Sequence, residues 1–187
     1  MTITEILNKF ATKGSETTVF VDIIETPLGK LIASADEEYL YVVAFEDSKN
    51  IEKPFVVLSR ELSCDFVMGY NKVLKEFKSE INAYFKGELT KFAVPIKTFG
   101  SEFQKEVWKN LMEVPYGTTQ TYGNFAKALG KSSSHSRAVG AACGANAHVI
   151  VIPCHRIVGT GTNGGYGCGM SRKEWLIDHE NKLCDKV

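Results

Sequence analysis

The sequence predicts an α+β protein of two domains, in which a small antiparallel sheet with a helix precedes a mostly helical half. Short segments rich in β-branched and aromatic residues recur between residues 17 and 45, as is typical of strands. From residue 101 onward, apolar residues recur instead at helical spacing. Residues 91–98 form an extended connector between the two patterns. We therefore expect one domain at residues 1–91 and a second at residues 92–187.

The elements expected in the N-terminal half follow from these patterns. They are a helix at residues 4–12, strands at 17–24, 30–34, 40–45 and 54–59, and a helix at 70–85. An acidic tip at residues 35–38 joins two of the strands, and Gly87 is placed to end the helix. The result would be a small antiparallel sheet with helices packed on it.

The C-terminal half predicts a helix-turn-helix. Ser101 is a plausible N-cap for a first helix, and Thr121 caps a helix at residues 122–129 that Gly130 ends. A polar turn at 131–134 leads to a second helix of small residues at 135–142. Arg137 stands near the start of this helix, where a recognition helix reaches DNA. A packed helix pair with a solvated arginine is the alternative interpretation.

A final helix is expected at residues 172–183, with Trp175, Leu176 and His179 on its inward face and Glu180 following. Between the helix-turn-helix and this helix, residues 151–158 place two apolar pairs around a polar centre. The pairs resemble short buried strands, and Pro153 ends the first of them. Cys154 and His155 would then stand at a strand end on opposite faces. Contact between them would need a turn or a bridging water.

A thiol attacks as its thiolate, and a neighbouring imidazole is one way to produce that thiolate. A buried cysteine is otherwise an inert small hydrophobe. The glycine-rich segment at 159–169 surrounds Tyr166 and predicts a flexible loop whose backbone can approach a ligand. On the Cys-His pair alone the structural thiol is favoured, and a mere linker is the alternative interpretation of the loop; the other motifs of the chain change this balance.

Composition limits the classes of function. The chain has 187 residues, with 22 Lys+Arg balanced by 22 Asp+Glu, which argues against a long basic footprint but permits a local basic face. No apolar run approaches membrane-spanning length and the N-terminus lacks the layout of a secretory signal, so we expect no membrane partner and an intracellular protein. The five cysteines are odd in number and irregularly spaced, which does not indicate a disulfide framework. No CxxC pair is present, and we expect neither a metal nor a cofactor.

These motifs together resemble the O6-alkylguanine-DNA alkyltransferase family. The motifs that carry the resemblance are Phe103-Gln104, Val107-Trp108, Pro115-Tyr116-Gly117, Thr121-Tyr122-Gly123, Arg137-Ala138-Val139-Gly140, Ile152-Pro153-Cys154-His155-Arg156-Ile157 and Arg172-Lys173 with Leu176. The match covers roughly residues 90–183. The N-terminal half resembles only the architecture of the family's ribonuclease-H-like domain, and the C-terminal half its winged-helix-like domain.

The resemblance implies a stoichiometric DNA repair reaction. Cys154 would take the alkyl group permanently from the O6 atom of a damaged guanine in double-stranded DNA. His155 would act as base through a water, and Glu180 would orient the imidazole. Asn146 would be the hinge residue between the recognition helix and the active-site segment. The protein would be a single-turnover monomer, nuclear in a eukaryote and cytoplasmic in a prokaryote.

The resemblance also implies how the damaged base leaves the helix. Arg137 would fill the vacated space, Tyr122 would press on the neighbouring phosphate, and Ala138 and Gly140 would allow close approach to the groove. The remaining expected contacts are a base pocket walled by Tyr166, Gly167 and Cys143, and DNA-backbone contacts from Gln104, Gly123, Lys131 and Thr160.

The sequence departs from the family pattern after the hinge, where Ala147-His148 replaces the usual proline. We expect this to loosen the turn and leave the relay intact. A damage-sensing DNA binder that does not transfer alkyl groups is one alternative, and a Cys-His hydrolase that turns over repeatedly is another. The variant Cys154→Ala distinguishes the three hypotheses.

Overall fold

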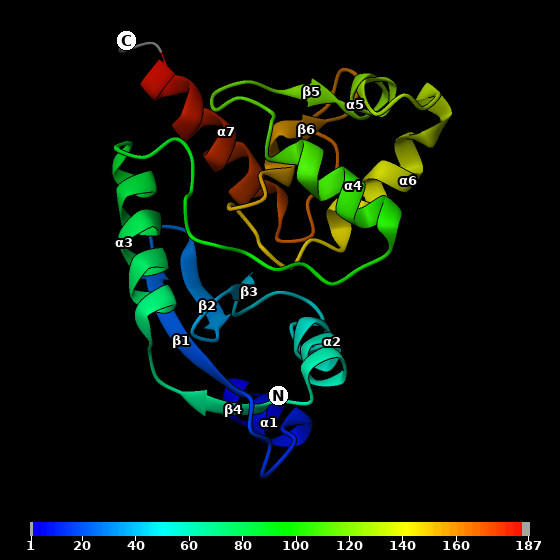
Figure 1. Cartoon of the computed structure of the whole chain (residues 1–187). Coiled ribbons are helices and arrows are strands. Elements are labelled where there is room, and N and C mark those ends of the chain that lie inside the picture. Colours follow the sequence, from blue (N-terminus) through cyan, green and yellow to red (C-terminus); the bar gives the residue numbers. More distant parts are fainter. Residues whose placement is uncertain (1, 185–187) are drawn as a thin grey trace. The chain divides into compact units, whose positions relative to one another are not determined.

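The computed structural model describes residues 2–184, with side chains through Lys182, and confirms the α+β class. The chain divides into two compact units, with the boundary in the sequence between Phe99 and Gly100 (Figure 1). The segment before this boundary is tied to the first unit, because Leu40 N donates to Pro95 O at 2.8 Å and Lys97 N donates to Leu40 O at 3.1 Å. Residues 92–98 therefore belong with the first unit, whereas the sequence placed them with the second.

The first unit holds a four-stranded sheet. Its strands are β1 (Thr18–Thr26), β2 (Gly29–Ala35), β3 (Leu40–Phe45) and β4 (Asp65–Met68), arranged in the order β3-β2-β1-β4. The first three strands pair antiparallel, as predicted, but β4 pairs parallel with β1. The sheet is thus mixed rather than antiparallel. The four residues of β4 are too few to show an alternating pattern, which is why the sequence did not reveal it.

The expected strand at residues 54–59 is wrong, because this segment lies within the helix α2 (Glu52–Leu62). Proline is tolerated in the first turn of a helix, where Pro54 stands. The apolar run that suggested a strand is split by the helix, which buries Phe55 and Leu58 and leaves Val56 40% exposed. Short apolar runs do not distinguish the two structures.

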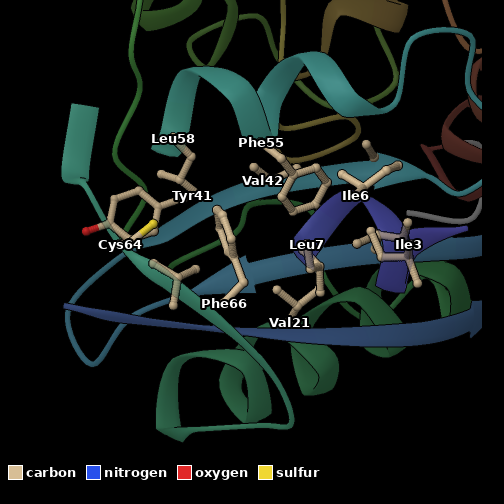
Figure 2. Packing of buried hydrophobic residues seen from close by; sticks show 13 residues of the cluster. Ile3, Ile6, Leu7, Val21, Tyr41, Val42, Phe55, Leu58, Cys64 and Phe66 are labelled. Atoms are coloured by element: carbon tan, nitrogen blue, oxygen red, sulfur yellow. The ribbon is translucent and has the colours of Figure 1, made fainter. Parts of the chain in front are cut away.

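Helices cover both faces of this sheet. The helix α1 (Ile3–Phe10) packs with α2 on one face, where Figure 2 shows Ile6 and Phe55 close to Val42 of the sheet. The helix α3 (Lys72–Lys86) packs on β1 to β3 through Leu74, Phe77, Ile81 and Tyr84. Gly87 ends α3 in the left-handed region, as expected.

The second unit contains the predicted helix-turn-helix. The helix α4 (Glu102–Leu111) begins with a capping box in which Ser101 and Gln104 each satisfy the other's backbone N–H. After α4 the chain forms β5 (Gln120–Thr121), α5 (Tyr122–Ala128), the short 3₁₀ helix η1 (Ser133–His135) and α6 (Ser136–Gly144). Thr121 caps α5 by accepting from Asn124 N at 3.2 Å, which confirms that prediction.

Two contacts hold the elements of the second unit together around the segment that contains Cys154. The indole Nε1 of Trp108 donates to Ala142 O at 2.8 Å and holds α4 against α6. The strand β5 pairs parallel with β6 (Ile157–Val158), so the start of α5 lies beside the segment that follows Cys154. No helix within residues 2–184 is long and apolar enough to cross a membrane.

The last helix, α7 (Met170–Cys184), differs from the expected inward face. Lys173, Leu176 and Glu180 are its buried residues. Trp175 and His179 are only partly buried and stack on each other with ring centroids 4.7 Å apart. Two ionisable side chains therefore face the interior from this helix.

Candidate active site

The sequence suggested that Cys154 stands at the end of a strand, but the structure shows otherwise. Residues 151–152 form no strand, and Cys154–Arg156 form a 3₁₀ turn, η2, that leads directly into β6. All three side chains of η2 are buried. Successive side chains of a 3₁₀ turn are spread around its axis rather than alternating between two faces. The turn thus removes the geometric objection to a thiol and an imidazole that act together.

The Cys154 thiol is 5% exposed and accepts a hydrogen bond from Asn146 Nδ2 at 3.2 Å. Burial raises the pKa of the Cys154 thiol to about 11, while the Asn146 hydrogen bond and the nearby Lys173 charge act in the opposite direction. The sulfur is therefore protonated near neutral pH, and its reaction needs a base that removes the proton as a new bond forms.

Asn146 holds the loop that precedes the turn. Its Nδ2 also donates to Ile152 O at 2.9 Å, and its Oδ1 accepts from His148 N at 2.8 Å. These contacts are made with alanine at position 147. Within this loop the buried Ile150 adopts a φ of 72°, an uncommon left-handed conformation for a β-branched residue.

His155 and Glu180 form a buried pair, with Nε2 and Oε1 2.7 Å apart. Burial lowers the pKa of His155 despite its carboxylate neighbour. Burial also opposes ionisation of Glu180, but the hydrogen bonds from His155 and Arg156 and the positive charge of Arg156 lower its pKa below the usual value. The imidazole is thus neutral and donates its Nε2 hydrogen to the carboxylate. Its Nδ1 has no hydrogen-bond partner among the described residues and retains the lone pair of a base.

Arg156 completes this cluster, and only its place in the motif hinted at a role when the sequence was considered alone. Its Nε donates to Glu180 Oε2 at 2.9 Å and its Nη2 to Glu180 Oε1 at 3.1 Å. Its Nη1 donates to Val114 O at 2.6 Å. Gly117 N donates to Glu180 Oε2 at 3.1 Å, so both carboxylate oxygens accept two hydrogen bonds.

Lys173 is a second functional candidate that the sequence analysis missed. Its side chain is fully buried, and Nζ donates to Ile157 O at 2.6 Å and to Gly165 O at 3.0 Å. The ammonium group lies 5.8 Å from the centre of the Tyr122 ring. Lys173 precedes Glu180 by two helical turns on the same face, and this spacing is the signal that could have revealed it.

A cavity of about 490 Å³ opens beside Cys154. Its wall comes from four separate segments and includes eight of the predicted site residues. Those eight are Tyr122, Arg137, Gly140, Cys143, Asn146, Cys154, Tyr166 and Gly167, and the further lining residues are Ser136, Gly144, Val149, Gly165 and Cys168. The structure thus brings the thiol, the small-residue helix α6 and the glycine-rich loop around one space.

The other predicted DNA-contact residues do not line this cavity. Gln104 is occupied in the capping box of α4, and Lys131 lies 3.6 Å from Glu106 as an ion pair. Ala138 and Thr160 are exposed, and Gly123 is half-buried near Ser136. Contacts with DNA at these positions stay predictions.

Within residues 2–184 no cluster of three or more potential ligands is arranged to hold a metal ion. The four described cysteines, Cys64, Cys143, Cys154 and Cys168, are free thiols. The side chain of Cys184 lies outside the described part of the chain.

Comparison with known proteins agrees with this geometry. Residues 19–98 match the ribonuclease-like domain and residues 102–182 the DNA binding domain of 6-O-methylguanine DNA methyltransferase. The chain is 39% identical over 164 residues to the methylated-DNA–protein-cysteine methyltransferase of Methanosarcina acetivorans, covering 87% of this chain and 98% of that protein. The Shigella flexneri protein of the same name is 38% identical, covering 86% and 94% of the two chains.

Solved structures give the same result. The Mycobacterium tuberculosis O6-methylguanine methyltransferase superimposes with a TM-score of 0.75 at 33% identity, covering 88% of this chain and 94% of that one. A structure of the M. tuberculosis protein in complex with DNA gives the same TM-score at 32% identity and the same coverage. The chain belongs to the 6-O-methylguanine DNA methyltransferase family.

Proposed function

We propose that this protein repairs O6-alkylguanine in double-stranded DNA by moving the alkyl group irreversibly to Cys154, once per molecule. The observation that carries the proposal is a thiol at the wall of a cavity, held by Asn146 and adjoining a neutral imidazole. DNA repair by alkyl transfer also follows from the names of the relatives. No cofactor is needed, because the lesion itself supplies the electrophilic carbon.

The chemistry balances with the residues present. The Cys154 sulfur bonds to the alkyl carbon as the bond from that carbon to guanine O6 breaks. The thiol proton passes to His155 Nδ1 through a water molecule, and Glu180 stabilises the resulting imidazolium. The departing guanine takes up one proton from solvent and is restored, while the imidazolium releases the former thiol proton to solvent, so the protons balance. The S-alkyl thioether is stable, so the protein is consumed.

A base paired in a duplex cannot reach this thiol, so the lesion must rotate into the cavity. Arg137 lies on α6 at the cavity wall and is the candidate to fill the space that the base leaves. Tyr122 lies on the opposite helix of the pair at the same wall and is the candidate to press on the phosphate. The protein would act on DNA as a monomer.

The proposal is tested by intact mass after incubation with a duplex that carries one O6-methylguanine. We expect a gain of one methyl group per molecule, mapped to the Cys154 peptide and absent from Cys154→Ala. The variants Cys143→Ser and Cys168→Ser are matched controls, because they remove the other two thiols of the cavity and should keep the gain.

Two other results would support the alternative functions. Binding of the methylated duplex without a mass gain would support the damage-sensing alternative and direct attention to Ala147. Repeated turnover of an ester or amide that needs no DNA would support a hydrolase. The hydrogen bonds that join Asn146 to His148 N and Ile152 O are made with alanine at position 147, so they give no reason to favour the damage-sensing alternative.

A further inference from the structure

We propose that Arg156 is a positioning residue for alkyl transfer, which keeps Glu180 ionised and His155 neutral so that Nδ1 can take the thiol proton. This inference rests on the proposed function, and it identifies Arg156 as the residue that keeps His155 able to act as the base. Arg156 does not line the cavity, and its side chain donates hydrogen bonds to Glu180 and to Val114 O, so its effect is exerted through Glu180 and His155.

The first argument concerns charge. Glu180 is 1% exposed, and a buried carboxylate is stable only with a countercharge and satisfied hydrogen bonds. His155 does not supply this charge, because its buried imidazole is neutral. The guanidinium of Arg156 does, through two hydrogen bonds to separate oxygens of the same carboxylate. The buried ion pair is therefore between Arg156 and Glu180, with His155 as a neutral donor.

The second argument concerns the direction of the imidazole. An ionised Glu180 can only accept hydrogen bonds, so it selects the His155 tautomer with hydrogen on Nε2. Without Arg156, the carboxylate would recover neutrality by drawing a proton onto itself or onto His155. A protonated carboxyl could donate to Nε2 and reverse the tautomer, and a protonated imidazole carries hydrogen on Nδ1. In both cases Nδ1 is lost as a base.

The third argument concerns placement. Nη1 of Arg156 donates to Val114 O, and the guanidinium lies 5.6 Å from the centre of the Tyr116 ring. The same arginine therefore ties the active-site turn to the segment that leads into β5 and Tyr122. The groups that face His155 and Glu180 are Arg156 of η2, Lys173 of α7 and Gly117 N before β5, and Tyr116 lies beside Arg156.

The test measures single-turnover methyl transfer against pH in the full-length protein, recording the rate constant and the final amount transferred separately. In the wild type, the acidic decline in rate should lie below pH 6.5, because the buried imidazole resists protonation. For Arg156→Met we expect a rate at least about tenfold lower at pH 7, and an acidic decline moved to higher pH. Arg156→Lys retains the charge and should keep the wild-type midpoint with a smaller loss of rate.

Arg60→Met is the matched control, since this arginine is exposed on α2, and it should change neither quantity. The double variant Arg156→Met with Glu180→Gln removes both charges. It should transfer more methyl, or transfer it faster, than Arg156→Met alone, even if the single variant folds poorly.

A lower final amount with an unchanged pH midpoint in Arg156→Met would show a merely structural role and overturn the inference. A double variant no better than the single one would also overturn it. Failure of the wild type to transfer methyl would instead refute the proposed function, so the two failures are distinguishable.

Discussion

Removal of the Asn146 side chain should lower both stability and the transfer rate, by amounts that follow from its three contacts. In Asn146→Ala, Ile152 O and His148 N each lose one hydrogen bond, although Ile152 O keeps the bond from Cys154 N at 2.8 Å. An intramolecular hydrogen bond contributes about 0.5–1.5 kcal/mol. We therefore expect a total loss of about 1–3 kcal/mol in the free energy of unfolding measured with urea.

The third contact affects the chemistry. The amide that donates to the Cys154 sulfur stabilises the thiolate, so its loss raises the thiol pKa. A rise of one pKa unit corresponds to about a tenfold slower transfer. Asn146→Asp separates the two effects, because it retains an acceptor for His148 N but places a negative charge beside the sulfur. We expect it to be more stable than Asn146→Ala and slower in transfer.

Urea unfolding and single-turnover transfer from a methylated duplex provide the two measurements. Asn110→Ala is the matched control, since Asn110 is exposed on α4 and makes its hydrogen bond within that helix. The reasoning would be refuted by an Asn146→Ala protein that unfolds at lower urea yet transfers methyl at the wild-type rate. That result would mean that the Asn146 amide acts only on the loop.

Three further outcomes are expected. Stability should fall as pH drops below about 6.5, because burial lowers the pKa of His155 and only the unfolded chain then binds the proton; urea midpoints against pH check this. Trp108→Phe should cost about 0.5–1.5 kcal/mol of unfolding free energy, since it removes the indole hydrogen bond to Ala142 O, which keeps only the bond from Ala145 N. Lys173→Met should slow methyl transfer and make the glycine-rich loop more sensitive to limited proteolysis, because Gly165 O loses its charged donor.

The sequence predicted well those features that local patterns determine. The caps at Ser101 and Thr121 and the end of α3 at Gly87 are confirmed, because each depends on a few neighbouring residues. The error at residues 54–59 and the missed β4 have another origin. A helix that buries only Phe55 and Leu58 does so because of the sheet beneath it, and parallel pairing of β4 joins segments distant in sequence.

The candidate site shows the same limit. The motif identified Cys154 and His155, but their expected place at a strand end was wrong because local hydropathy does not distinguish a 3₁₀ turn from a short strand. The buried contacts of Arg156 and Lys173 could not be predicted from the sequence, because arginine and lysine side chains are usually exposed to solvent. Their hydrogen-bond acceptors are brought to them only by the tertiary structure. The sequence therefore predicted the reacting groups, Cys154 and His155, but not the buried cations, Arg156 and Lys173, that influence their protonation.

The left-handed backbone at Ile150 imposes two opposing demands on sequence variation at this position. Glycine would relieve a conformation that costs about 1–3 kcal/mol. It would also delete a side chain that is 1% exposed, and truncation of such a side chain costs about 2–5 kcal/mol. The cost of truncating the side chain exceeds the cost of the left-handed conformation, so a large side chain at this position stabilises the protein more than glycine would. A library randomised at position 150 and selected for active protein should therefore return large aliphatic residues and reject glycine.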